Sequence, residues 1–138
     1  PEFFIDLLNN YQPTVEYSNE LNRLSDILGK CNDSYMKKVI DLYGVIKLMH
    51  VLDLVQRSNP TQIDPKIKLS HSLLALYILR NIVESKIGRE YIIKSYEMEP
   101  EESNLLRTFV SYLSLDNVAA NEVLMDLINS LNESNNFS

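Results

Sequence analysis

The residues that could do chemistry are few, and the most suggestive of them surround a single glycine. In RNIVESKIGREYIIKS (80–95), Gly88 lies between Lys86 and Arg89, a composition that a phosphate-binding loop could have. Such a loop needs several glycines, as in G-x-x-x-x-G-K or G-x-G-x-x-G, so that consecutive backbone N–H groups can approach the anion. A glycine that stands alone better fits a tight structural corner. We therefore predict that Gly88 joins two helices and that Lys86, Arg89 and Lys94 lie on a solvated face.

Histidine, cysteine and glutamate side chains are the other groups that could bind a metal or act in catalysis. Neither His50 nor His71 has a cysteine or carboxylate at a metal-ligand spacing such as H-E-x-x-H. The single Cys31 lacks the signature of a nucleophile activated by a histidine. The glutamates of YEMEPEES (96–103) lack the Asp/Asn/Gly order of a calcium loop, and we expect a solvated acidic loop there. We expect structural or surface roles for these residues, and no enzymatic activity, metal or cofactor.

Charge and composition limit the partners of the chain. Its 138 residues carry a net charge of -6, which argues against a nucleic-acid surface and favours a basic partner. No uncharged apolar run approaches the ~18 residues of a membrane helix, so no transmembrane segment is expected. A lone cysteine and the lack of a signal-peptide pattern favour the cytoplasm. The chain opens at Pro1 without a Met, and we expect it to be part of a longer protein.

Apolar residues recur at three- and four-residue spacing throughout, with only three glycines, which predicts an all-α chain. LLALYIL (73–79) is apolar on every side, so we expect its helix at the centre of the core. The helices that we expect are separated by proline, glycine and capping residues and cover approximately 1–10, 14–28, 36–43, 45–55, 65–86, 91–93, 105–113 and 117–131. The polar tail 132–138 shows no periodicity and is predicted to be frayed.

Several helix boundaries can be assigned to particular residues. Gly29 and Gly44 follow apolar-periodic runs, and glycine is the residue type that most easily takes the left-handed conformation after a helix. Asp64 and Pro65 are suited to the N-cap and first position of the longest helix.

The two corners at Gly44 and Gly88 lie 44 residues apart, within the ~40–47-residue period of armadillo and HEAT repeats. In each case a short helix is followed by a tight corner and further helix, as in an armadillo unit. We predict an all-α, armadillo-repeat-like right-handed superhelix of short and long helices, forming a single domain over 1–131.

Four segments also resemble, in order and spacing, the armadillo-repeat regulatory region of diaphanous-related formins, the formin homology three segment. PEFFIDLL (1–8) is similar to that region's opening P-x-x-[FY]-I-x-L-L, and YGVIKLMHVLDLV (43–55) to its G-[LV]-x-x-L-[LM]-x-[IV]-L stretch. LYILRNIVESKIGREYIIKS (76–95) resembles L-[KR]-x-[FIL]-[LM]-N-[NST]-[KR]-[FY]-G-x-x-x-[MI]-[LI], and NEVLMDLINSL (121–131) takes the place of the helix ending L-L-x-x-L. Together they cover nearly the whole chain.

The resemblance implies a regulatory binding module of an actin-assembly factor, located in the cytoplasm and at the cytoskeleton. In that family a groove between long helices holds an amphipathic helix from the same protein's C-terminal autoregulatory segment, and an activated Rho-family GTPase displaces it. The actin-nucleating domain lies elsewhere in those proteins. An unrelated armadillo or HEAT scaffold that binds a partner helix is the alternative.

The resemblance also assigns partner-binding residues. Asn32 matches an asparagine near both the GTPase and the inhibitory helix, Ser130 a small residue of the groove, and Lys86 a residue of the rim. We include Asn81, on the helix that leads to this rim.

The chain departs from the family at Glu84 and Ser85, which replace an asparagine pair, and at Glu133, which replaces an apolar groove residue. Acidic residues there would disfavour an apolar helix that carries acidic groups and would suit a basic one. Autoinhibition by a typical segment is therefore in question. The resemblance also places part of the GTPase site before Pro1, so we expect low GTPase affinity from this chain alone.

Overall fold

The computed structural model describes residues 1–98 and 118–135, and the secondary structure within them is helical. The helices are α1 (Glu2–Asn9), α2 (Tyr17–Lys30), α3 (Asp33–Asp41), α4 (Gly44–Arg57), α5 (Pro65–Glu84), α6 (Lys86–Met98) and α8 (Val118–Asn135). The prediction of an all-α chain is confirmed. None of the helices in these two ranges is long and apolar enough to cross a membrane.

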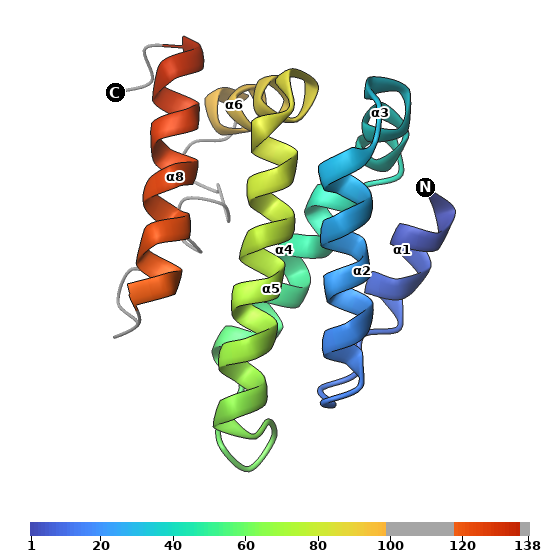
Figure 1. Cartoon of the computed structure of the whole chain (residues 1–138), viewed down its shortest axis with the longest axis vertical. Helices are drawn as coiled ribbons and strands as arrows, with labels where there is room; N and C mark the ends of the chain where they lie inside the picture. The colour runs from blue at the N-terminus through green and yellow to red at the C-terminus, as the bar shows by residue number, and fades with distance from the viewer. Residues whose placement is uncertain (99–117, 136–138) are drawn as a thin grey trace.

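The long helices α2, α5 and α8 lie side by side in one layer and run in the same direction (Figure 1). Helix α4 packs against α5 behind this layer, and α1 packs against α4. The helices α3 and α6 follow the ends of α2 and α5 and pack against each other at the same end of the molecule (Figure 1). The C-terminal ends of all three long helices therefore lie at one edge, which we call the C-terminal edge.

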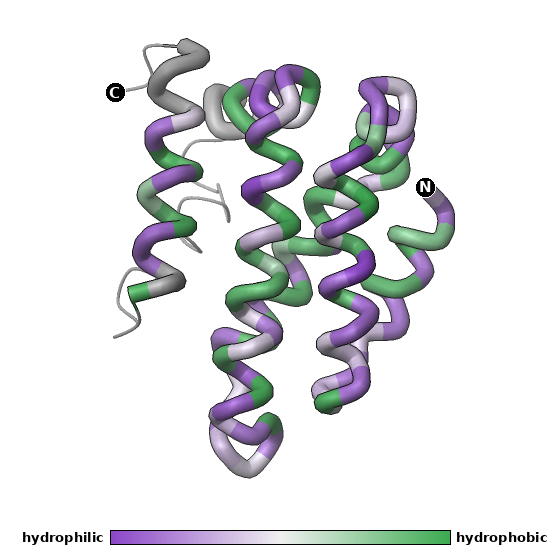
Figure 2. The backbone as a smooth tube through the Cα atoms, in the orientation of Figure 1, coloured by the Kyte–Doolittle hydropathy of each residue, from purple (hydrophilic) through white to green (hydrophobic). Residues whose placement is uncertain are grey.

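Helix α5 occupies the centre of the core, as its continuous apolar run predicted. It packs against α2, α4, α6 and α8. Hydrophobic and hydrophilic residues alternate along α2 and α5, as the hydropathy colouring in Figure 2 shows. The buried side chains on α5 belong to His71, Ser72, Ala75, Leu76, Ile78, Leu79, Ile82 and Val83. These positions form a broad stripe along α5, wide enough to pack against several neighbouring helices.

Local capping explains where helices α3 and α5 begin. The side chain of Asp64 accepts a hydrogen bond from the Lys66 N–H at 2.8 Å, and Pro65 occupies the first turn of α5, as predicted. Asn32 caps α3 in the same way, because its Oδ1 accepts from the Tyr35 N–H at 2.8 Å.

Two predicted glycine corners are wrong in detail. Gly29 lies inside α2, and none of the described glycines has a positive φ. The left-handed residue between α3 and α4 is Tyr43, with φ 65°, while Gly44 is the first residue of α4. Glycine is required at 44 for space, because a Cβ there would lie 2.7 Å from the Val39 carbonyl oxygen and 3.2 Å from the Phe4 ring. Close packing of α1 and α3 against this corner thus explains the glycine.

The C-terminal third of the chain differs from the prediction at its boundaries. Helix α6 continues to Met98, into the segment predicted as an acidic loop; the rest of that segment and the expected helix at 105–113 lie outside the described residues. Helix α8 continues to Asn135, so residues 132–135 are helical and not part of a frayed tail. The last residues, 136–138, are outside the described ranges.

Candidate functional site

The C-terminal edge collects the residues that the sequence assigned to partner binding. Glu84, Ser85 and Lys86 lie where α5 gives way to α6, and Asn32 lies just after α2. Ser130 and Glu133 belong to the C-terminal half of α8. These segments are distant in the sequence but meet at one end of the layer, at the top of the view in Figure 1.

Asn81 links two helices of the layer. Its side-chain Nδ2 donates to the Ser25 carbonyl oxygen at 2.8 Å and lies 3.1 Å from Ser25 Oγ. Gly29 lies one turn further along α2, where a Cβ would approach Asn81 Nδ2 to 3.6 Å. Asn81 is only partly buried, but its amide group is engaged in holding α5 against α2. Its position beside the predicted site is therefore explained by packing.

Ser85 forms the corner between α5 and α6. Its Oγ accepts a hydrogen bond from the Gly88 N–H at 2.9 Å and donates to the Ile82 carbonyl oxygen at 3.1 Å. Its own carbonyl oxygen accepts from the Arg89 N–H at 2.9 Å. Ser85 thus satisfies a carbonyl group at the end of α5 and an N–H group at the start of α6, as a tight helix junction requires.

Gly88 lies in the first turn of α6, where the two helices approach most closely. A Cβ at this position would lie 2.0 Å from the Ile82 carbonyl oxygen, a distance that no side chain tolerates. Its N–H group is already bonded to Ser85 Oγ. The corner that the sequence predicted at this glycine is present, and the N–H that a phosphate loop would use is occupied within the protein.

Arg89 was predicted to lie on a solvated face, but it closes the C-terminal end of α5. Its Nη1 donates to the carbonyl oxygens of Val83 at 3.2 Å and Glu84 at 2.9 Å. These are carbonyls that a helix end leaves without intrahelical donors. The positive charge also offsets the partial negative charge of the helix end. Sequence spacing alone could not reveal this role, because it depends on the sharp turn at Ser85.

Glu84 and Lys86 are the charged groups that remain exposed at this corner. The Glu84 side chain is 60% exposed, and its Oε1 lies 3.9 Å from Arg80 Nε. Lys86 is also exposed. Ser130 is half-buried, on a helix that packs against α5. Glu84, Lys86 and Ser130 can therefore contact a partner without first breaking a buried bond.

Exposed charges of both signs lie near this edge, because Lys30 at the end of α2 and Lys86 at the start of α6 are exposed beside the carboxylates. Asp26 of α2, Glu84 of α5 and Asp126 of α8 are all exposed. Arg80 bridges two of them: its Nη1 lies 3.6 Å from Asp126 Oδ2, and its guanidinium group lies 5.1 Å from the centre of the Tyr77 ring. The C-terminal ends of α2 and α8 add partial negative charge, whereas Arg89 offsets that of α5. Glu84 and Asp126 share a single guanidinium group, so this pair keeps a net negative charge.

The remaining chemical candidates serve the fold. His71 is 1% exposed, and its ring is hydrogen-bonded to Tyr11 Oη at 2.6 Å and to Ser18 Oγ at 3.1 Å. Burial lowers the pKa of His71 below its usual value, so the neutral ring is favoured. This Ser18–His71–Tyr11 row has the order of a nucleophile, a base and an orienting group. However, the pocket that Tyr11 lines includes neither Ser18 nor His71.

Cys31 and His50 form no chemical site within the described ranges. Burial raises the pKa of the Cys31 thiol, which donates to the Leu28 carbonyl oxygen at 3.5 Å. A thiol with a raised pKa is a poor nucleophile at neutral pH. His50 is exposed, and residues 1–98 and 118–135 contain no group of three or more His, Cys, Asp or Glu side chains that could hold a metal.

The sequence was also compared with known proteins. No family model, curated protein or solved structure matches the chain.

Proposed function

We propose that the chain is a regulatory protein-binding module that takes a helix of a partner along the C-terminal edge of α2, α5 and α8. The observation that carries this proposal is the meeting of Asn32, Glu84, Lys86 and Ser130 at one edge of three parallel helices. A row of helices with an exposed face is suited to the helix-in-groove mode of recognition.

The order of helices supports an armadillo-like arrangement. A short helix, α3, is followed by α4 and the long α5, and the short α6 lies against α3 with the long α8 beside α5 (Figure 1). In such repeats each unit buries the apolar face of its neighbour. The same order underlies the resemblance to the regulatory region of diaphanous-related formins. On this proposal the partners are a Rho-family GTPase and an autoregulatory helix of the same protein, at the actin cytoskeleton.

The charge of the edge defines the helix further. Glu84 and Asp126 share Arg80 as their counter-ion, so we propose that the bound helix is amphipathic and places a basic residue against this pair of carboxylates. Complementary charge at a rim raises the association rate and sets the orientation of the partner.

Charge reversal at Glu84 tests whether the partner helix binds at the C-terminal edge. The autoregulatory segment encoded by the same gene is titrated as a labelled peptide against the chain, and Glu84→Lys is expected to weaken its binding by about threefold to tenfold. Ser130→Asp is expected to change its affinity too, because it adds a carboxylate at a half-buried position of the same edge.

The matched control is Glu16→Lys, the same reversal at an exposed residue just before α2, at the opposite end of the layer. It should leave the affinity unchanged. Unchanged binding in both Glu84→Lys and Ser130→Asp would place the helix elsewhere on the molecule.

An unrelated armadillo or HEAT scaffold would share the helix order and could share the groove. It would not distinguish the nucleotide states of a Rho-family GTPase. The rest of the gene also distinguishes the two hypotheses, because a proline-rich tract and an actin-assembly domain downstream would support the formin hypothesis.

A further inference from the structure

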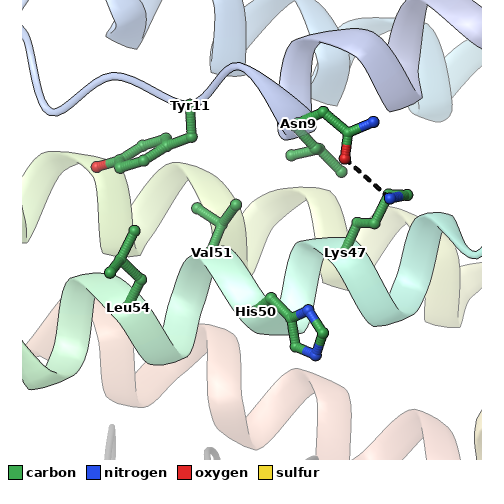
Figure 3. A pocket seen from close by; sticks show the side chains of 7 residues that line it. Asn9, Tyr11, Lys47, His50, Val51 and Leu54 are labelled. Carbon is green, nitrogen blue, oxygen red and sulfur yellow. Dashed lines mark hydrogen bonds between the residues drawn. The ribbon is translucent and has the colours of Figure 1, made fainter.

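A pocket on the opposite layer is independent of the C-terminal edge. It has a volume of about 270 Å³ and is lined by Leu8, Asn9, Tyr11, Lys47, His50, Val51 and Leu54. Figure 3 shows Asn9 and Tyr11 on one side of it and Lys47, Val51 and Leu54 of α4 on the facing side. We call this pocket the α1–α4 groove.

Exposed apolar side chains extend the groove along α4. Tyr43 is 64% exposed, Ile46 40% and Leu54 49%. With His50, these residues recur every three or four positions and so share one face of the helix. From 43 to 54 that face spans about 16 Å at 1.5 Å per residue, or three helical turns. Such a stripe matches the apolar face of a second helix laid against it.

The charge of the groove is opposite to that of the molecule as a whole. Lys47 Nζ is held at 2.8 Å by Asn9 Oδ1, an uncharged acceptor, and no carboxylate in the described ranges forms an ion pair with it. The neighbouring carboxylate on α4, Asp53, is already paired with Arg57 at 3.0 Å. A chain with net charge -6 thus presents an unneutralised ammonium group between apolar side chains.

We propose that the α1–α4 groove binds an amphipathic helix of another protein that carries an acidic residue beside its apolar face. The apolar residues would cover Ile46, Val51 and Leu54, and the carboxylate would reach Lys47. The pocket is open and smaller than the usual ~300–1,000 Å³ of a small-molecule site, which favours a side chain as its occupant. A second copy of the chain fits less well. It would bring its own Lys47 to the same face, and the carboxylate of α4, Asp53, is already paired with Arg57.

A displayed library of random 16-residue helical peptides, selected on the intact chain, tests this proposal. The enriched peptides should carry apolar residues at i, i+3 or i+4, and i+7, together with Asp or Glu. Their binding should fall by about tenfold or more in Leu54→Asp and Lys47→Glu. Leu54 is exposed, so Leu54→Asp should unfold at the same temperature as the wild type. Lys47→Glu loses the bond to Asn9, so its thermal unfolding is measured beside its binding.

Charge exchange gives a readout that loss of folding cannot imitate. Replacing the acidic residue of an enriched peptide by lysine should restore its binding to Lys47→Glu while weakening its binding to the wild type. Lys86→Glu, the same reversal at the C-terminal edge, is the matched control and should have no effect. This control also keeps the result separate from the proposed function.

Three results would overturn the proposal. The first is that enriched peptides bind Leu54→Asp as tightly as the wild type, and the second is that the enriched peptides are basic. The third is that sedimentation shows a dimer of the chain that Leu54→Asp abolishes, which would make a second copy the occupant.

Discussion

Gly88 is the residue whose identity is most strictly required by the fold. Its ideal Cβ would lie 2.0 Å from the Ile82 carbonyl oxygen and 2.8 Å from Ile82 Cγ2. Gly88→Ala should therefore push α6 away from α5 and lower the free energy of unfolding by about 1–3 kcal/mol or more. Urea unfolding followed by circular dichroism measures this change.

Gly29→Ala is the control for this substitution. Gly29 is helical and exposed, and the closest atom to its ideal Cβ is Asn81 Nδ2 at 3.6 Å. Alanine there should be neutral or stabilise the chain by up to about 1 kcal/mol. Equal losses of stability at both positions would contradict the close helix approach at Gly88.

His71 makes the stability of the chain depend on pH. Burial lowers its pKa in the folded state relative to the value near 6.5 of the unfolded chain. The folded state therefore binds fewer protons, and this contribution to stability is present above about pH 6.5 and is lost as the pH falls below it. The free energy of unfolding should decrease from pH 7.5 to 5.5, and His71→Gln should reduce that decrease.

The exposed His50 gives the comparison for the pH dependence. His50→Gln is the matched control, because it makes the same substitution at an exposed histidine of the folded chain. If both histidine variants behave alike, the buried ring of His71 is not the source of the pH dependence.

At the scale of the helices, apolar spacing predicted most elements, because each long helix buries one recurring stripe. The four buried residues of α2, for example, are Tyr17, Leu21, Leu24 and Leu28, the stripe expected from the sequence. Capping at Asp64 and Pro65 was also predictable, since it depends on neighbours in the sequence. The extension of α8 to Asn135 was not predicted, because NESN lacks any apolar periodicity.

Roles that depend on distant neighbours were not predictable from spacing. Asn81 was assigned to partner binding, yet its amide bonds to Ser25, 56 residues away. Arg89 and Ser85 stabilise the α5–α6 corner through geometry that exists only once the chain has turned there. The position of Asn32, Glu84 and Ser130 near one edge, in contrast, follows from the parallel course of α2, α5 and α8, since each residue lies at or near the C-terminal end of one of these helices.

Asn81 can be tested as a link between helices. Asn81→Ala removes the donor to the Ser25 carbonyl oxygen and should lower the free energy of unfolding by about 1–2 kcal/mol. Asn22→Ala, on the exposed side of α2, should change stability by less than about 0.5 kcal/mol. A variant at 81 that is fully stable would show that the contact contributes nothing to holding α5 against α2.

At the scale of the whole molecule, the two layers present different surfaces. The layer of α2, α5 and α8 carries Glu84 and Asp126 around a shared Arg80 near its C-terminal edge, whereas α4 carries a lysine among apolar side chains. A regulatory module with two such faces could hold a basic helix and an acidic helix at once. We propose protein recognition as the role of both faces.

The titration of the chain with Rho-family GTPases, loaded in parallel with a GTP analogue or with GDP, tests the central claim most directly. The γ-phosphate orders the switch segments of such GTPases, so a regulatory region that responds to them must distinguish the two states. An N-terminally extended version of the chain should be measured beside it, because the resemblance places part of the GTPase site before Pro1. We predict that the GTP-loaded form of at least one member binds the extended chain at least tenfold more tightly than its GDP-loaded form. Equal binding of the two forms, or no binding of either, would contradict this account.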